Sequence, residues 1–151
     1  MDKIVFITGA SSGIGAGCAR KFASQGASLI LNARNVNKLS ALKEELEKQY
    51  GAKIYLLPFD VRDRKAATSA LESLPKEWQS IDILVNNAGL VIGTDKEQEG
   101  SLDEWDIVID TNIKALLAMT RLIVPGMVER KRGHIINIGS IAGDAAYPGG
   151  S

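Results

Sequence analysis

Short apolar stretches alternate with stretches of helical spacing along the whole chain. Residues 3–8 form a β-branched apolar run typical of a buried parallel strand, and Ile14, Cys18 and Phe22 then recur at helical spacing. Four more strands are predicted at residues 28–33, 53–59, 81–85 and 135–138. Because helical stretches separate these strands, the pattern predicts one α/β domain, residues 1–151, with a parallel sheet and helices on both faces.

Turn and capping residues indicate where the helices begin and end. Gly51 is expected to end the second helix, and Asp63 to cap the third. Ser101 and Glu104 have capping-box spacing, which predicts a long helix from there to about residue 129, bent at Pro125.

Right-handed crossovers predict the strand order 3-2-1-4-5, a Rossmann-type doubly wound sheet. The winding direction reverses between the first and fourth strands, and ligands of open α/β sheets bind beyond the carboxyl ends of the strands at such a point. Two loops meet there: residues 8–15 and residues 86–89. The second loop, Asn-Asn-Ala-Gly, is by itself equally compatible with a simple turn.

The loop at residues 8–15 is rich in glycine and leads into a helix. Glycine can adopt positive φ, and the free N–H groups of a first helical turn favour phosphate. The P-loop spacing fails, because Ile14 stands where its second glycine is needed, and the G-x-G-x-x-G spacing ends on Cys18. The remaining pattern, Thr-Gly-x-x-x-Gly-x-Gly, predicts a nucleotide-binding turn, with a plain helix-packing turn as the alternative.

These motifs together resemble those of the short-chain dehydrogenase/reductase family. The glycine turn and Asn-Asn-Ala-Gly are similar to the two signatures of that family, and Asp60-Val61, Asn112 and Ser140 stand where it has functional residues. Within the family, residues 74–85 and 133–140 look most like the NADP-dependent 3-hydroxy acid dehydrogenases that oxidise serine or allo-threonine.

The resemblance implies a role for each of these residues. Backbone groups of residues 9–14 would hold the cofactor phosphates and ribose, Asp60 and Val61 the adenine, and Asn87 a ribose, while Asn86 would hold strands together. Asn112 would distort its helix and hold a water for proton relay, with an exposed helical asparagine as the alternative, and Ser140 would donate to the substrate oxygen. The expected cofactor-binding residues are Gly9, Ser11, Ser12, Gly13, Ile14, Arg34, Asp60, Val61, Asn87, Ala88 and Gly89, and the expected catalytic residues are Ser140 and Asn112.

Arg34 indicates which cofactor is bound. NAD sites commonly place an acidic residue at the end of the second strand, but that end reads Asn32-Ala33-Arg34 here. Because arginine can pair with a 2′-phosphate that a carboxylate would repel, NADP is predicted over NAD. The alternative is a surface or capping arginine.

One family motif, Tyr-x-x-x-Lys, has no match. Tyr147 is followed four residues later by Ser151 instead of lysine. We therefore expect the chain to be truncated after the fifth strand and inactive as given, part of a homo-oligomeric enzyme that transfers hydride between NADP and a secondary alcohol, such as a small 3-hydroxy acid. The alternative is a complete, non-catalytic NADP-binding module.

Composition and charge restrict the partners. The 151 residues carry a net charge of zero, so nothing favours nucleic acid or an anionic membrane. A single cysteine, Cys18, fits a reducing compartment, and with no signal peptide or long apolar run the expected location is cytoplasmic. No metal is expected, because no cluster has metal-ligand spacing. His134, Trp78 and Trp105 are interpreted as surface or packing residues.

Overall fold

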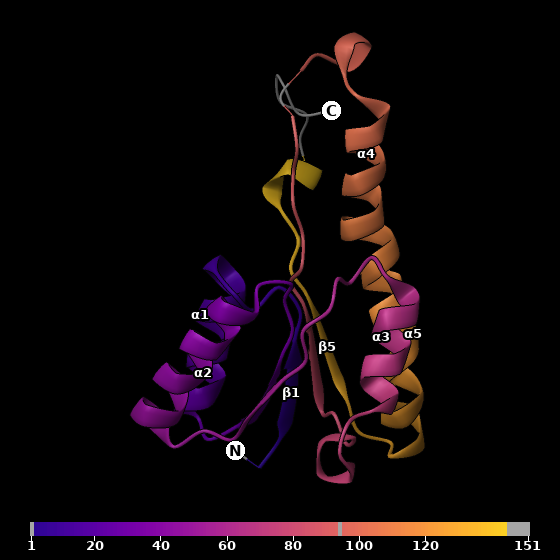
Figure 1. Cartoon of the computed structure of the whole chain (residues 1–151). Helices are drawn as coiled ribbons and strands as arrows, with labels where there is room; N and C mark the ends of the chain where they lie inside the picture. Colours follow the sequence, from indigo (N-terminus) through magenta and orange to yellow (C-terminus); the bar gives the residue numbers. More distant parts are fainter. Residues whose placement is uncertain (1, 94, 145–151) are drawn as a thin grey trace.

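A parallel five-stranded sheet in the order β3-β2-β1-β4-β5 forms the centre of the molecule, which confirms the predicted topology (Figure 1). The computed structural model describes residues 2–93 and 95–144, so Tyr147 lies outside the described residues. The strands are β1 (Ile4–Ile7), β2 (Ser28–Leu31), β3 (Ile54–Leu56), β4 (Ile83–Asn86) and β5 (His134–Asn137). The helices are α1 (Gly13–Ser24), α2 (Val36–Tyr50), α3 (Arg64–Glu72), α4 (Leu102–Ile109) and α5 (Leu116–Glu129), with short helical turns η1 (Lys76–Trp78), η2 (Glu97–Glu99) and η4 (Ile141–Gly143).

Successive residues of the central strands face two separate cores, as the pleat of a doubly covered sheet requires. Val5 and Ile7 of β1 pack with apolar residues of α1 and α2, whereas Phe6 packs with Met119 and Ile123 of α5. Figure 1 shows α1 and α2 on one side of the sheet and α3 and α5 on the other. Both faces of β1 and β2 are therefore shielded from water.

The strand β3 is shorter than predicted, because a side chain replaces part of its ladder. Leu57 N still donates to Leu31 O at 3.0 Å. Beyond this point the Nδ2 of buried Asn32 donates to Leu57 O at 3.0 Å and to Phe59 O at 3.1 Å. The asparagine amide satisfies carbonyls that a longer strand would have paired with backbone N–H groups.

The predicted helix boundaries at Gly51 and Asp63 are confirmed. Gly51 ends α2 in the left-handed conformation with φ 62°, and the carboxylate of Asp63 accepts from the N–H groups of Lys65 and Ala66. Ser101 Oγ accepts from Glu104 N at 3.4 Å at the start of α4. These short-range signals could be read from the sequence because each acts within one turn.

The long helix expected from residue 101 to about 129 is divided by a π-helical segment, η3 (Asp110–Ala115). The irregularity thus lies around Asn112, and α5 runs through Pro125. The division falls at Asn112, where a local distortion of the helix was expected, and the bend expected at Pro125 stays a prediction. In a π segment the backbone hydrogen bonds join residues i and i+5 in place of i and i+4. The spacing of apolar residues, which predicted the helix, does not reveal such a short change.

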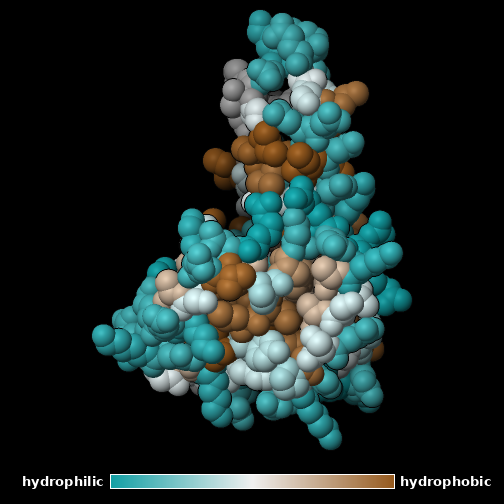
Figure 2. Space-filling view, in the orientation of Figure 1, coloured by the Kyte–Doolittle hydropathy of each residue, from teal (hydrophilic) through white to brown (hydrophobic). Residues whose placement is uncertain are grey.

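Part of the molecule projects beyond the sheet and carries exposed apolar side chains. Figure 1 shows α4 and the segments after β4 and β5 in this projection, and Figure 2 shows hydrophobic atoms gathered there. Val91 is 74% exposed, Leu102 71% and Ile141 87%. Among the described residues, no helix combines the length and the apolar character that crossing a membrane would need.

Candidate functional site

The turn between β1 and α1 has the backbone that its glycines predict. Gly9 and Gly13 adopt φ 65° and 53°, a region that other residues rarely occupy. Ala10 N donates to Asn32 O at 2.9 Å, which ties the turn to the end of β2. The glycines therefore allow the chain to reverse direction between a buried strand and a helix that starts at the carboxyl edge of the sheet.

Gly15 allows α1 to lie against both loops of the site. A Cβ at Gly15 would overlap the carbonyl oxygen of Gly9 and come within 2.5 Å of Asn87 Nδ2. Gly17, two residues further along α1 and so on its opposite side, has no atom within 4 Å of the position of an added Cβ. Of these two glycines of α1, only Gly15 lies in the close contact, where helix, turn and neighbouring loop meet.

Thr8 and Asn87 join the two loops through hydrogen bonds. Thr8 Oγ1 accepts from the backbone N–H groups of Asn87 and Ala88, both at 3.0 Å, and donates to Val85 O at 3.3 Å. Asn87 Nδ2 donates to Thr8 O at 2.9 Å and Gly9 O at 3.1 Å. The sequence led us to expect that the loops meet, but it did not single out Thr8.

The first turn of α1 is open to solvent. Ser12 is the N-cap residue but its side chain makes no capping hydrogen bond, and Ser12 and Gly13 are exposed. Ile14 is 62% exposed, unusual for isoleucine at the start of a helix next to the core. The hydroxyls and N–H groups of residues 11–14 are therefore available at the carboxyl edge of the sheet, next to Ala88 and Gly89 across the Thr8–Asn87 contact.

Asn86, as expected, links strands. Its Nδ2 donates to Asn137 Oδ1 of β5 at 2.9 Å and to Thr120 Oγ1 of α5 at 3.0 Å. Because the residue is buried, both bonds lie inside the molecule. The first asparagine of the Asn-Asn-Ala-Gly loop thus has a structural role, whereas the second faces the glycine turn.

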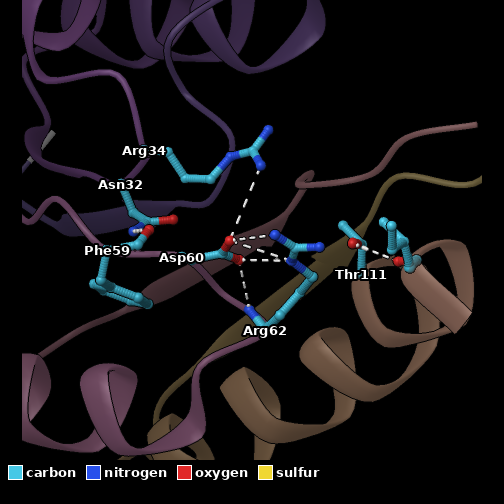
Figure 3. Close-up of polar contacts among 7 residues, drawn as sticks. Asn32, Arg34, Phe59, Asp60, Arg62 and Thr111 are labelled. Atoms are coloured by element: carbon cyan, nitrogen blue, oxygen red, sulfur yellow. Dashed lines mark hydrogen bonds and ion pairs between the residues drawn. The ribbon is translucent and has the colours of Figure 1, made fainter. Parts of the chain in front are cut away.

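Arg34 lies just beyond the carboxyl end of β2 and extends into solvent. Its side chain is 67% exposed, and its nearest carboxylate oxygen, Asp60 Oδ2, lies 4.0 Å from NH1 (Figure 3). This contact is at the limit of an ion pair and holds the guanidinium only weakly. Arg34 is therefore free to meet an anionic group at this edge of the sheet.

Asp60 follows β3 and is held by a residue that sequence reasoning missed. Arg62 donates to the Asp60 carboxylate through its backbone N, Nε and NH2, and the NH2 contact is 2.7 Å (Figure 3). The hydrogen bonds from Arg62 lower the pKa of Asp60 below its ordinary value, against the opposing effect of partial burial. Asp60 is an ionised acceptor, and buried Val61 follows it directly.

Asn112 binds the loop after β4. Its Oδ1 accepts from Leu90 N at 2.9 Å, and its Nδ2 donates to Leu90 O at 2.7 Å. It lies in the π-helical segment, so the expected local distortion of the helix is confirmed. One N–H of the Asn112 amide and one lone pair of its oxygen are left for a further partner such as a water.

Ser140 follows β5 and is exposed. Its Oγ accepts from Ala142 N at 3.1 Å, at the start of η4. Within residues 2–93 and 95–144, Ser140 makes no hydrogen bond to Asn112 or to the glycine turn. The described structure thus assembles the two loops, Arg34 and Asp60 at one edge, and leaves Ser140 on a separate loop with its hydroxyl proton free to be donated.

Comparisons with known proteins agree with these motifs. The family model described as short chain dehydrogenase matches residues 3–151. The chain belongs to this family. The family resemblance inferred from the glycine turn and the Asn-Asn-Ala-Gly loop is confirmed, together with its Rossmann-type fold.

Individual relatives cover nearly all of the chain. It is 49% identical over 148 residues to NADP-dependent 3-hydroxy acid dehydrogenase YdfG of Escherichia coli O6:H1 (strain CFT073), a match over 98% of this chain and 58% of that protein. It is 43% identical over 150 residues to sulfoacetaldehyde reductase 2 of Chromohalobacter salexigens, over 99% of this chain and 59% of that protein. The chain therefore spans rather more than half the length of these relatives.

A solved structure of similar fold contains a cofactor. The closed form of serine dehydrogenase complexed with NADP+ matches with a TM-score of 0.89 at 48% identity, over 97% of this chain and 58% of that chain. The described residues thus share their fold with a protein whose structure was solved with NADP+ bound.

The residues present fit a dinucleotide phosphate. At Gly15 there is no room for a Cβ, so α1 lies close to both loops. The side chain of Ser12 makes no capping hydrogen bond at the exposed first turn of α1. Arg34 offers a positive charge that Asp60 holds only weakly. No group of three or more His, Cys, Asp or Glu side chains in the described part of the chain could hold a metal ion. The N–H groups, hydroxyls and guanidinium of the site suit a phosphate.

Proposed function

We propose that this chain is the cofactor-binding part of an NADP-dependent oxidoreductase that transfers hydride between NADP and a secondary alcohol. The observation that carries the cofactor assignment is Arg34, an exposed arginine beyond β2 where an NAD site would have a carboxylate. NADP, when bound, supplies the hydride acceptor or donor. The comparisons give no support to the alternative of a non-catalytic NADP-binding module.

Each predicted residue has a role that its geometry permits. Residues 9–14 bind phosphate through backbone N–H groups and the hydroxyls of Ser11 and Ser12. Asp60, kept ionised by Arg62, accepts from the adenine amino group, and Val61 supports the ring. Asn87, Ala88 and Gly89 border the adenine-side ribose next to the glycine turn.

Two residues act on the substrate side. Ser140 donates its hydroxyl proton to the substrate oxygen, which stabilises negative charge that develops there. Asn112 keeps the loop after β4 in place through Leu90, distorts the helix locally, and holds a water for proton relay. Small 3-hydroxy acids such as serine or allo-threonine are the proposed substrates, and the protein is proposed to be a cytoplasmic homo-oligomer.

Arg34→Ala tests the cofactor assignment. In the protein expressed from its complete gene, the Kd for NADP should rise about tenfold to a hundredfold, because a charge-assisted contact to the 2′-phosphate is lost. The Kd for NAD should stay the same. Lys48→Ala, which removes a positive charge at the opposite end of α2, is the control and should change neither value. An unchanged NADP/NAD ratio in Arg34→Ala would refute the assignment.

Ser140→Ala and a substrate panel test the reaction. Removal of a hydrogen-bond donor to developing charge should lower kcat about 10² to 10³ fold, with little change in the Kd for NADP. Equal losses in both would indicate a folding role for Ser140. Because one relative is named for sulfoacetaldehyde, the panel compares serine, allo-threonine and sulfoacetaldehyde by the change in NADPH absorbance. Turnover confined to sulfoacetaldehyde would contradict the 3-hydroxy acid proposal.

A further inference from the structure

The carboxylate of Asp60 lies between two arginines that hold it very differently. Arg62 donates to both carboxylate oxygens at 2.7 to 3.2 Å, whereas the nearest guanidinium nitrogen of Arg34 lies 4.0 Å away. Figure 3 shows the two guanidinium groups approaching Asp60 from different sides. The pair with Arg62 is local and strong, and the contact with Arg34 is loose.

Exposure follows the same division. The side chains of Arg62 and Asp60 are 31% and 29% exposed, compared with 67% for Arg34. The backbone N of Arg62 also donates to Asp60 Oδ1 at 3.0 Å, so the pair is built on a two-residue turn and does not depend on a distant element. Arg62 is thus a fixed counterion, while Arg34 is the arginine that can move.

A carboxylate beside a 2′-phosphate site has two unfavourable effects. It repels the phosphate, and it attracts the arginine that should bind the phosphate. Without Arg62, Asp60 would be an ionised carboxylate with Arg34 as its nearest cation, 4.0 Å away. The bidentate pair with Arg62 offsets the negative charge of the Asp60 carboxylate, which reduces both effects.

We propose that Arg62 is a positioning residue for cofactor specificity: by engaging Asp60 it leaves Arg34 available for the 2′-phosphate of NADP. The inference rests on the proposed function. It assigns Arg62 an indirect role, so its effect should disappear when Asp60 no longer carries a charge. It also explains how an acidic residue that contacts adenine is compatible with a neighbouring phosphate dianion.

A double-mutant cycle tests this, with the Kd for NADP and for NAD measured separately by calorimetry on the protein expressed from its complete gene. Arg62→Ala should weaken NADP relative to NAD by roughly threefold to tenfold, the range expected of one partly exposed charge interaction. In the Asp60→Asn background, the same substitution should leave the NADP/NAD ratio unchanged. Arg20→Ala is the matched control, because Arg20 forms a similar two-point pair with Glu45 on α1 and α2, and it should leave the ratio as in the parent.

The outcomes separate this inference from the proposed function. If the parent protein shows no preference for NADP, the proposed cofactor is wrong. If the parent prefers NADP and Arg62→Ala keeps that preference, the inference is overturned. A loss of equal size with and without the Asp60 charge would also overturn it, because Arg62 would then contact the phosphate directly. Thermal unfolding of each variant shows that the cycle compares folded proteins, and a structural defect would weaken NADP and NAD alike.

Discussion

The inner strands of the sheet and its edge strand β5 differ in how completely they are covered. Phe6 of β1 and Leu29 of β2 are 0% exposed, whereas His134, Ile135 and Asn137 of β5 are all exposed. The helices differ in the same way. Leu39, Leu42 and Leu46 of α2 are buried, but α4, although rich in apolar residues, has none that is buried. Apolar sequence thus predicts an element, and its neighbours decide whether it is shielded from water.

The same difference separates the parts of the candidate site. The glycine turn, Asn87 and Asp60 are held by bonds within the well-covered region. Ser140 follows the exposed strand β5, and among the described residues its hydrogen bonds are local: Oγ accepts from Ala142 N and the carbonyl oxygen from Gly143 N. We therefore expect substitutions in the covered region to act mainly on cofactor binding, and substitution of Ser140 to act mainly on turnover.

The largest expected effect tests the burial difference directly. Leu29→Ala should lower the free energy of unfolding by about 2 to 5 kcal/mol, because it leaves a cavity in a fully shielded core. Ile135→Ala, its counterpart on β5, should cost about 1 kcal/mol, because that side chain is already 36% exposed. Urea unfolding of both variants provides the measurement. Equal losses of stability would show that β5 is as well covered in solution as β2, which would contradict the difference in burial.

The second prediction concerns the contact between α1 and the two loops. Gly15→Ala should lower stability by about 1 to 3 kcal/mol and weaken NADP binding, since its Cβ has no space beside Gly9 and Asn87. Gly17→Ala lies on the same helix in open space and should stabilise the protein by about 0.5 to 1 kcal/mol. Thermal unfolding with and without NADP measures both. A neutral Gly15→Ala would mean that the close approach is not needed.

A third prediction compares one asparagine from each region. Asn112→Ala should cost about 1 kcal/mol and speed hydrogen exchange at the Leu90 amide, which loses its acceptor. Asn35→Ala should cost a similar amount, because it removes the N-cap of α2, but should leave exchange at Leu90 unchanged. Identical exchange profiles for the two variants would show that Asn112 does not hold the loop.

The smallest expected effect is on the pH dependence of stability. In the folded protein the hydrogen bonds from Arg62 lower the pKa of Asp60 below its ordinary value of 3.8. Ionised Asp60 therefore stabilises the fold at pH values above the unfolded pKa, and this stabilisation is lost as the pH falls through the folded pKa. From pH 6 to pH 3 the parent should therefore lose more stability than Asp60→Asn. Arg20 likewise lowers the pKa of Glu45, but that pair is more exposed. Glu45→Gln should therefore change the loss of stability between pH 6 and pH 3 less than Asp60→Asn does. The reverse order in thermal unfolding would contradict this.

The sequence by itself determined the elements, their order in the sheet and the two loops of the site. Strand and helix periodicity, Gly51 and Asp63 act over a few residues, and right-handed crossovers then leave few possible topologies. The glycine turn was recognisable because its residue spacing is itself the signal. These features depend on local chemistry and handedness, both of which a linear sequence contains.

Only the tertiary structure decided which side chains meet and which remain exposed. Thr8 bonds to Asn87, 79 positions away, and Asn112 bonds to Leu90, 22 positions away, and no local pattern specifies either pair. Arg62 lies only two residues from Asp60, and an aspartate that accepts from the backbone two residues later was a signal available in the sequence. The 4.0 Å contact between Arg34 and Asp60 could not be read from the sequence, because it depends on β2 and β3 lying side by side in the sheet.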